Sequence, residues 1–522
     1  MTDEARASAP VPVAIPPVYR GAADTSSFAS NALKFLSERR LQQGEVFGCR
    51  IVTWGVVFAA SHAAVNEVLV DENDSFSAKA AYSLFTGLNL FGENVLFSDG
   101  EKHNRLRQLL LESDFAHTDR LVEKKYVHLI RMIVENFTEA MSLKVKVKST
   151  NKLEINVYDT MKTLCGDLLA GIFLGFKIKE KNKGNVKGNC KCKGKSCNCI
   201  AVVEGTEHFQ DLQSKFWRAS TSSGIKLNVS FFGVSLKSAY AKGEVAKWQI
   251  LDILKSIDKK RVSETEPTSI STTTLKAENS SPINSDSGSD SKAKLHEAQC
   301  RCPFVSMSES KSEGNLNASS EKMMGMTEEE RLNHYLMFSS SLVAKSIASV
   351  ITSFMLEIAR RPEILDKLKR EIRSNAENAN NSYLDRVILE VERLYPPIIG
   401  CCRYSKKDVQ IRGKSIPSGC NVWCSFLTSN RDPEHFSDPL AFRPDRWNNE
   451  TVRKKDDLVH FSFGAFSRSC LGKPLAKVVV REMIAGMILN FDWQTLPNQN
   501  LEYRWLPVVR PVDGLNISLS KC

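Results

Sequence analysis

The stretch FSFGAFSRSCLG, residues 461–472, decides how the rest of the chain is interpreted. It places one cysteine, Cys470, between an aromatic-glycine run and a helix-forming segment, KPLAKVVVREMIAGMILNFDW (residues 473–493). Arg468 precedes this cysteine by two residues and Gly472 follows it by two. A thiolate needs its charge stabilised, and the free amides and dipole at a helix N-terminus favour an anion. The segment therefore suits a thiolate at Cys470, and the rest of the sequence decides between this role and that of a structural core thiol.

The bulk composition is that of a folded globular protein. Hydrophobic residues make up 42% and charged residues 25% of 522 residues, enough to bury a large core. The net charge is +11, but eight lysines and one glutamate lie between Lys177 and Lys195. Because the charge is concentrated there, it indicates a basic loop rather than a basic protein, and no nucleic-acid partner is expected.

The sequence also predicts a compartment. No window approaches twenty consecutive apolar residues, and the N-terminus MTDEARASAPVPVAIPPVY lacks the charged and apolar regions of a signal peptide. Fourteen cysteines without a secretory signal predict mostly free thiols in a reducing, intracellular compartment, in a soluble or peripheral protein. Cys165 and Cys424, set among apolar residues, are expected to be small core side chains.

Hydrophobic spacing predicts a mainly helical fold with a small β part. Residues 44–60 and 400–425 are expected to form short strands, and apolar spacings of three and four residues predict helices between them. Thr327 and Glu330 form a capping-box pattern, and neither Gly nor Pro follows until Pro362. A helix over about 327–361 would span roughly 50 Å, which only a central helix of a domain does.

Two segments interrupt this pattern, and we expect both to be disordered surface insertions in a single domain, 1–522. Residues 178–205 are rich in Lys, Gly and Cys, and residues 263–325 are rich in Ser, Thr and Asn. The first contains four cysteines in a Cys-x-Cys-x4-Cys-x-Cys pattern: Cys190, Cys192, Cys197 and Cys199. Four thiolates can hold Zn²⁺ or Cu⁺, but Cys-x-Cys is tighter than the usual structural-zinc spacing. A solvated basic loop that contacts an acidic membrane surface or a redox partner is the favoured interpretation.

A charged cluster is predicted near the end of the helical region. Glu390 and Arg393 in YLDRVILEVERLYPP share a helix face, where an exposed ion pair is the usual meaning. The apolar residues around them favour a buried pair, which needs further donors. Arg446 in DPLAFRPDRW is expected to fold back and complete a Glu-Arg-Arg structural triad.

These motifs, ExxR before LYPP, then FRPDRW, then FxxxxRxCxG, resemble in order and spacing the cytochrome P450 family. The resemblance extends from LKFLSERRLQQGEVFGCRI (residues 33–51) to the FDW and PVDG near the end. It implies the cytochrome P450 fold, with heme b held between the central helix and the helix after Cys470. RLYPPIIGCCR and LAKVVV…FDW are similar to the retinoid- and sterol-oxidising branch of that family.

The resemblance assigns a role to several residues around the heme. Cys470 looks like the axial thiolate ligand of the iron, and such ligation pushes electron density that favours O–O cleavage. Phe463 would pack on the ring, Gly472 would allow close approach, and Arg468 would pair with a propionate. His103, Arg107 and Arg403 match further positions that commonly hold propionates, although each also fits a solvated charge.

The chain departs from the family pattern in the central helix. Alignment backward from Pro362 places Leu342 and Val343 on the small Ala-Gly pair, Lys345 on the acid and Ser346 on the alcohol. A register starting at Phe338 instead places Ser339–Ser341 over the small residues, and the acid is absent in both. Lys345 and Ser346 are therefore the candidate proton donors, and O2 activation is uncertain.

A second departure lies in the cysteine loop. Phe466 occupies a position where the family carries glycine. Its bulk is expected to press on the proximal pocket or to displace the loop.

The resemblance implies a monooxygenase that acts on a lipophilic small molecule. Apolar residues of the segment 76–97 and the strand region would line the substrate cavity: Tyr82, Leu84, Phe85, Leu88, Leu90, Phe91, Ile398, Ile399, Leu506 and Val508. Electrons would come from a separate reductase or ferredoxin, since no flavin- or nicotinamide-binding glycine fingerprint is present. Two alternatives stay open: a heme-thiolate isomerase or dehydratase acting on a lipid hydroperoxide, and a heme-binding protein without turnover.

Overall fold

The computed structural model describes residues 13–14, 22–51, 54–70, 72–83, 90–112, 119–174, 206–221, 228–231, 234–265, 326–374, 382–448 and 460–522. The predicted insertion 178–205 lies outside these residues, as does the insertion 263–325 apart from its first three residues.

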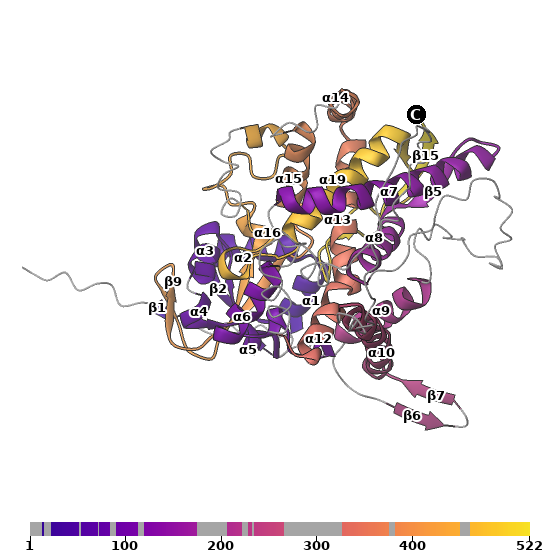
Figure 1. Cartoon of the computed structure of the whole chain (residues 1–522). Helices are drawn as coiled ribbons and strands as arrows, with labels where there is room; N and C mark the ends of the chain where they lie inside the picture. The colour runs from indigo at the N-terminus through magenta and orange to yellow at the C-terminus, as the bar shows by residue number, and fades with distance from the viewer. Residues whose placement is uncertain are drawn as a thin grey trace, which may run out of the picture.

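Helices dominate the described part of the chain, as predicted (Figure 1). The α-helices of the N-terminal half are α1 (Ala22–Ser30), α2 (Ala32–Gln43), α3 (His62–Val70), α4 (Glu72–Ser75), α5 (Ala78–Ser83), α6 (Gly100–Leu111), α7 (Asp119–Val147), α8 (Val157–Leu174), α9 (Thr206–Ser220) and α10 (Ala239–Thr265). Those of the C-terminal half are α12 (Glu328–Phe338), α13 (Ser341–Ala359), α14 (Pro362–Arg373), α15 (Tyr383–Leu394), α16 (Phe426–Ser429) and α19 (Lys473–Asn490). Short 3-10 turns are η2 (Val95–Phe97), η5 (Pro444–Asn448) and η6 (Phe466–Arg468).

The predicted central helix is present as two consecutive helices, α12 and α13. The Thr327 side chain accepts from the Glu330 N–H and Glu330 accepts from the Thr327 N–H, so the predicted capping box begins α12. The helix is interrupted at Ser339 and Ser340, where Ser340 adopts extended ψ and the Ser339 hydroxyl donates to the Tyr335 carbonyl at 2.6 Å. Serine hydroxyls compete in this way for helical carbonyls, which weakens a helix locally without by itself ending it.

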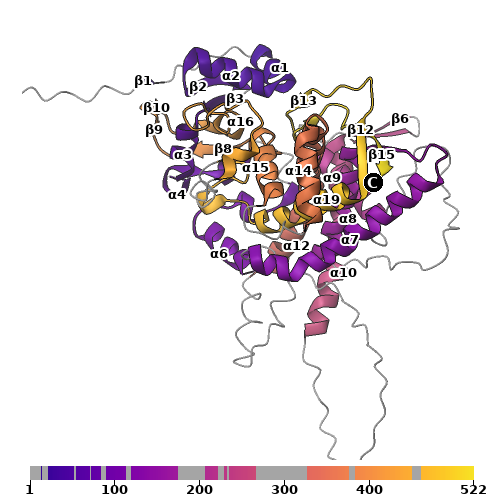
Figure 2. The same ribbon diagram turned by 90° about the horizontal axis from the view of Figure 1, so that it is seen from above.

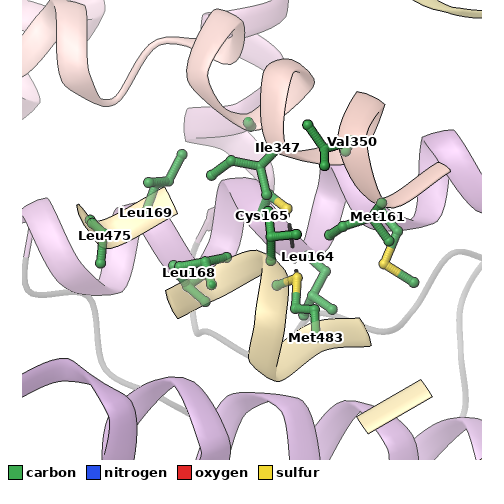
Figure 3. Packing of buried hydrophobic residues seen from close by; sticks show 14 of the residues in the cluster. Met161, Leu164, Cys165, Leu168, Leu169, Ile347, Val350, Leu475 and Met483 are labelled. Atoms are coloured by element: carbon green, nitrogen blue, oxygen red, sulfur yellow. Dashed lines mark hydrogen bonds between the residues drawn. The ribbon is translucent and has the colours of Figure 1, made fainter. Parts of the chain in front are cut away.

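The helical core gathers on α13. This helix packs against α8 and α19, and Cys165 of α8 lies with its sulfur 3.9 Å from that of Met483 of α19 (Figure 3). Ile347 and Val350 of α13 approach the same cluster. Cys165 and Cys424 are both fully buried, as predicted for core thiols. The apolar face of α19 thus fixes the position of its N-terminus, directly after Cys470.

The β part forms a separate layer beside the helices. A five-stranded sheet has the order β2-β3-β11-β8-β4, with β11 parallel to β3 and the other pairs antiparallel. Its strands are β2 (Val46–Ile51), β3 (Trp54–Ala59), β4 (Phe76–Ser77), β8 (Gly400–Ser405) and β11 (Asn421–Ser425). The predicted β segments 44–60 and 400–425 therefore join in one sheet through the pairing of β3 with β11. Helices α1 and α2 pack against β2 at one edge of this sheet (Figure 2).

Smaller sheets complete the fold. The three-stranded sheets are β12-β15-β5 and β1-β10-β9, and the two-stranded ones are β13-β14 and β6-β7. Their strands are β1 (Val13–Ala14), β5 (Leu153–Asn156), β6 (Asn228–Phe231), β7 (Val234–Lys237), β9 (Val409–Ile411), β10 (Lys414–Ile416), β12 (Phe491–Thr495), β13 (Tyr503–Arg504), β14 (Arg510–Pro511) and β15 (Asn516–Lys521).

One described span, Glu328–Ala359, is long and apolar enough to cross a membrane, with a mean hydropathy of 1.6. It consists of α12 and α13, and 72% of the apolar window is buried inside the protein. That burial is typical of the core helix of a globular domain.

Candidate heme-thiolate site

The cysteine loop folds on itself before α19. The Cys470 N–H donates to the Phe463 carbonyl at 2.8 Å, and the Gly464 N–H donates to the Phe461 carbonyl at 2.8 Å. Gly464 has a φ of +68°, a conformation that glycine adopts without strain. These bonds close a compact turn that presents Cys470 just ahead of the first turn of α19.

The thiol of Cys470 has opposing influences on its ionisation. Desolvation by the surrounding protein raises its pKa, whereas the Gly472 N–H and the charges of Arg107 and Lys473 lower it. The residue nevertheless keeps an exposed surface, so another group can reach it. A Cβ at Gly472 would lie 3.9 Å from the sulfur of Cys470, in van der Waals contact with it. Helix-terminal amides and nearby cations favour the thiolate that a metal ligand requires.

Two predicted propionate partners, His103 and Arg107 of α6, contact the cysteine loop itself. Arg107 donates to the Ser469 carbonyl at 2.9 Å and to its hydroxyl at 2.8 Å. His103 is buried, with Nδ1 2.9 Å from the Val95 carbonyl and Nε2 3.3 Å from the Ser467 carbonyl. Desolvation, followed by the charge of Arg468, lowers the pKa of His103, so a neutral ring is favoured. A neutral ring has one N–H and donates to only one of these two carbonyls, whereas the two hydrogen bonds of Arg107 fix the loop to α6.

The third predicted partner, Arg468, is engaged by a carboxylate that the sequence interpretation missed. Its guanidinium donates to Asp99 Oδ1 at 2.7 Å and to the Ser98 carbonyl at 2.8 Å. Asp99 also accepts from the hydroxyl of Ser77 and from the N–H of Ala78 at 3.0 Å. Asp99 is the N-cap residue of α6, but its side chain makes no capping hydrogen bond to that helix. It instead joins α5 to the cysteine loop.

Arg403 and Phe463 lie in different elements. Arg403 is in β8, is 4% exposed, and donates to the Cys402 carbonyl at 2.7 Å. The Nζ atom of Lys473 lies 5.9 Å from the Phe463 ring centroid, which puts this ring beside the first residue of α19.

The glycine-to-phenylalanine departure appears in the backbone. Phe466 has a φ of +52°, in the left-handed region where L-residues with a side chain are strained by roughly 1–2 kcal/mol. It begins η6, the turn that carries Arg468 toward Asp99. The loop therefore has a backbone conformation that suits glycine, and Phe466 adopts it at a conformational cost.

On α13, the predicted distal residues differ in exposure from the rest of the helix. Leu342, Val343, Lys345 and Ser346 are partly exposed, whereas every residue from 347 to 358 is buried. The Ser346 hydroxyl donates to the Leu342 carbonyl at 2.9 Å. The Lys345 Nζ atom lies 4.8 Å from the Trp217 ring centroid, and burial together with the charges of Lys162, Arg510 and Arg218 lowers its pKa to about 7.

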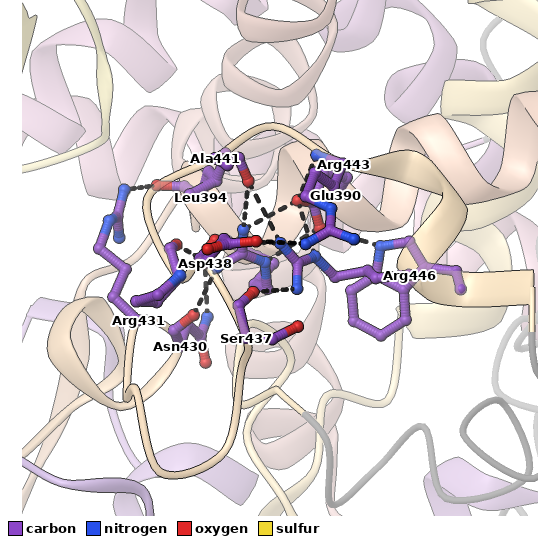
Figure 4. Close-up of polar contacts among 12 residues, drawn as sticks. Glu390, Leu394, Asn430, Arg431, Ser437, Asp438, Ala441, Arg443 and Arg446 are labelled. Carbon is purple, nitrogen blue, oxygen red and sulfur yellow. Dashed lines mark hydrogen bonds and ion pairs between the residues drawn. The ribbon is translucent and has the colours of Figure 1, made fainter.

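The ExxR motif lies at the buried end of a polar network that reaches the surface at Arg443 (Figure 4). Glu390 accepts from Arg393 at 2.8 and 3.0 Å, from Arg446 Nε at 3.0 Å, from Trp447 Nε1 at 3.0 Å and from the Arg443 N–H at 2.8 Å. Glu390 and Arg393 are both 0% exposed. The structure thus brings the predicted triad together and adds two donors. Five hydrogen bonds satisfy a carboxylate that would otherwise be very costly to bury.

This network is linked to the cysteine loop. Asn430 accepts from the Phe461 N–H at 2.9 Å and donates to the Ser462 hydroxyl at 3.0 Å. Arg393 donates to the Asn430 carbonyl at 3.0 Å. The ion-pair network therefore positions the start of the loop that ends at Cys470.

The predicted substrate-lining residues are partly described. Leu90, Phe91, Ile399 and Val508 are buried, while Leu84, Phe85 and Leu88 lie outside the described residues. Burial raises the pKa of Tyr82, whose ring lies edge-on to Phe97 at 5.5 Å. The Val509 N–H donates to the Pro397 carbonyl, which holds the loop after β13 against the segment that follows α15.

The possible Zn or Cu site is not tested. Cys190, Cys192, Cys197 and Cys199 lie outside the described residues. Within the described ranges, no group of three or more His, Cys, Asp or Glu side chains is placed to hold a metal ion.

The described residues fit a heme with a thiolate ligand. Cys470 is exposed just before the N-terminus of α19. Arg107 of α6 and Arg468 of the loop contact the loop region, and Arg403 lies in β8. The partly exposed residues of α13, from Leu342 to Ser346, leave helix surface that a bound group can contact. Arg468, however, already has a carboxylate partner, which distinguishes this loop from the expected propionate contact.

Comparison with known proteins gives a consistent result. The family model described as Cytochrome P450 matches residues 24–195 and 317–514. The chain is 24% identical over 503 residues to Cytochrome P450 26B1 of Danio rerio, covering 92% of this chain and 81% of that protein. It is 32% identical over 184 residues to Putative cytochrome P450 120 of Synechocystis, a match that spans 34% of this chain and only 41% of that protein.

Solved structures share the fold. The retinoic acid bound cyanobacterial CYP120A1 superposes with a TM-score of 0.68 at 22% identity, covering 98% of this chain and all of that one. The heme domain of cytochrome P450DA superposes with a TM-score of 0.70 at 14% identity, covering 98% of each chain. With the thiol loop, the buried ExxR network and a family match over most of its length, this chain belongs to the cytochrome P450 family.

Proposed function

We propose that the protein is a single-domain heme-thiolate monooxygenase that inserts one oxygen atom from O2 into a lipophilic small molecule. The observation that carries this proposal is the position of Cys470, an exposed thiol held by loop bonds at the N-terminus of α19 in a chain of this family. When bound, the heme would supply O2 binding and the redox chemistry of iron, and the Cys470 thiolate would hold the iron.

The chain's own residues have supporting roles. His103 and Arg107 hold the loop, and Glu390 fixes its start through Asn430. Ser346 and Lys345 are the candidate proton donors on α13. With a pKa near 7, Lys345 can hold or release a proton at neutral pH, which suits a general acid.

The substrate class follows from the apolar residues near the predicted cavity. Leu90, Phe91, Ile399 and Val508 carry no polar atoms in their side chains, and such walls favour lipophilic ligands. The structural neighbour CYP120A1 has retinoic acid bound, which supports a retinoid, sterol, terpenoid or fatty acid as the class to test here.

Electrons are proposed to come from a separate reductase or ferredoxin. The family match and the structural relatives account for the heme domain, and the sequence contains no flavin or nicotinamide fingerprint. A peripheral contact with an acidic membrane surface through the lysine-rich segment near residues 177–195 is a further part of this proposal.

A second candidate, a hydroperoxide isomerase or dehydratase, is favoured by one observation. The central helix carries Lys345 where the family places an acid, and a substrate that already contains an O–O bond needs no proton delivery to dioxygen. Such an enzyme would also need no electron donor.

The test separates these functions. The purified chain loaded with heme is expected to give a thiolate-type reduced carbonyl spectrum and to oxidise lipophilic compounds only with O2, reductant and a redox protein. Hydroperoxide consumption without reductant would instead assign the second candidate. Bound heme with neither reaction would assign a heme-binding protein without turnover, and a chain that binds no heme would refute all three.

A further inference from the structure

Lys345 of α13 lies within electrostatic reach of three cations from three other elements. They are Lys162 of α8, Arg218 of α9 and Arg510 of β14, and α13 packs against each of these elements. Burial is the main cause that lowers the pKa of Lys345, and the three other cations follow in the order Lys162, Arg510, Arg218. No carboxylate of the described residues offsets this repulsion at Lys345.

Tyr158 of α8 contacts two of these cations. Its ring centroid lies 4.8 Å from the Arg510 guanidinium and 5.9 Å from the Lys162 ammonium. Tyr158 is only 4% exposed, and in the described part of the chain its hydroxyl donates to no acceptor. Arg510, which can only donate, lowers the pKa of Tyr158, but burial outweighs it and raises the pKa to about 12. The hydroxyl therefore keeps its proton at neutral pH and is a free donor.

One acid contacts this group. Asp159, whose side chain is 56% exposed, pairs with Lys162 at 2.5 Å, so it compensates the charge of Lys162 but leaves that of Lys345. Trp217 stands over Lys345 with its ring face, which provides cation-π attraction but no charge. Arg218 is exposed and lies at the rim.

Gathering like charges in a partly buried place is unfavourable unless an anion is bound there. A carboxylate matches every group present. It accepts charge-assisted hydrogen bonds from a lysine and a guanidinium and takes the hydrogen bond that the Tyr158 hydroxyl is free to donate. A neutral alcohol would leave the positive charges uncompensated.

We propose that Lys345, Lys162, Arg510 and Tyr158 form a binding site for a carboxylate, belonging either to the lipophilic substrate or to a separate small anion. The first source rests on the proposed function, and it narrows the substrate class to amphipathic acids. A carboxylate bound beside Lys345 favours the protonated ammonium, because an opposite charge stabilises it.

The test measures binding rather than turnover. Isothermal titration calorimetry on the full heme-loaded chain compares dodecanoate, 1-dodecanol and acetate between pH 6 and pH 9. Dodecanoate is ionised throughout this range, so a change in its affinity reports on the protein. Lys345 is charged below about pH 7 and neutral above it, so dodecanoate affinity is expected to fall as the pH rises, with dodecanol unaffected.

Four variants assign the effect to residues. Lys345→Gln is expected to weaken the binding of dodecanoate by on the order of tenfold at pH 6, the loss typical of one charge-assisted hydrogen bond. The affinity for dodecanol should stay unchanged. Lys345→Arg should retain the affinity at pH 6 and lose the decline toward pH 9, because arginine stays charged. Tyr158→Phe removes only the hydroxyl and should weaken dodecanoate several-fold. Lys407→Gln, an equal charge change on an exposed lysine between β8 and β9, is the control.

The outcomes separate the sources. Dodecanoate binding without measurable acetate binding assigns the carboxylate to a long-chain ligand, and acetate that binds alone and competes assigns a separate anion. Equal affinity of dodecanoate for the wild type and Lys345→Gln, or equal affinity for dodecanoate and dodecanol, overturns the proposal. Failure of the proposed function would appear separately, as a missing thiolate-type carbonyl spectrum or missing turnover with the calorimetric differences intact.

Discussion

Replacing Glu390 by glutamine removes one negative charge from the centre of the ion-pair network and changes little else. Glutamine has the same shape and keeps one acceptor oxygen, but its NH2 group points a donor at the donors of Arg393, Arg446 or Trp447. The guanidinium of Arg393 is 0% exposed and would lose its carboxylate.

The free energy of unfolding is expected to fall by about 3–5 kcal/mol, the range measured when one partner of a buried ion pair is removed. Summing a charged hydrogen bond for each of the five contacts would give more, roughly 7–15 kcal/mol, but glutamine retains part of them, so the smaller range applies. Because the network positions Asn430 and the start of the cysteine loop, heme retention should weaken together with stability.

Urea titration of the heme-loaded chain, followed by far-UV circular dichroism and heme absorbance, measures both effects. Glu363→Gln, an equal change at an exposed position near the start of α14, is the control and should cost less than about 0.5 kcal/mol. A loss below about 1 kcal/mol for Glu390→Gln, or one equal to the control, would refute the argument that this carboxylate holds the loop.

Three further predictions concern the cysteine loop. Phe466→Gly should raise the free energy of unfolding by up to about 1 kcal/mol, since relief of the positive φ exceeds the entropic cost of glycine, and urea titration measures it. Cys470→Ser should abolish the thiolate-type carbonyl spectrum while the circular dichroism spectrum stays unchanged, because the side chain is exposed and similar in size; an intact thiolate spectrum would contradict the assignment. Asp99→Asn should cost about 1 kcal/mol by weakening the Arg468 contact. Burial raises the pKa of Asp99, but hydrogen bonds from Ser77 and the N–H of Lys79, with the charge of Arg468, lower the pKa overall. The stabilisation from Asp99 is therefore present above the unfolded pKa of about 3.9 and is lost as the pH falls below it. Wild-type stability should therefore fall more steeply than that of Asp99→Asn between about pH 4 and pH 2, and parallel curves would contradict this role.

Several elements were predictable because their causes are local. The capping box at Thr327 and Glu330 depends on side chains three residues apart, and the structure forms it as the sequence indicates. The helix after Cys470 follows from apolar spacing and a proline in its first turn. The interruption at Ser339 and Ser340 was not predicted, since serine is only moderately unfavourable in a helix and no Gly or Pro stands there.

The partners of the site residues were less accessible to sequence analysis. Asp99 precedes Arg468 by 369 residues, and its N-cap pattern gave no indication that it would pair across the fold. Lys345 was identified as a departure in the central helix, but its neighbours Lys162, Arg218 and Arg510 come from three other elements. Such long-range pairings depend on how helices pack, which no short motif specifies.

The sequence by itself determined the family, the capping box at Thr327 and the helix that follows Cys470, because these depend on residue type and short spacing along one element. Tertiary structure decided that Arg468 meets Asp99, that Arg107 holds the loop backbone, and that Lys162 and Arg510 meet at Tyr158. The physical reason is that charge pairing acts through space, so it is fixed only when distant segments are packed together.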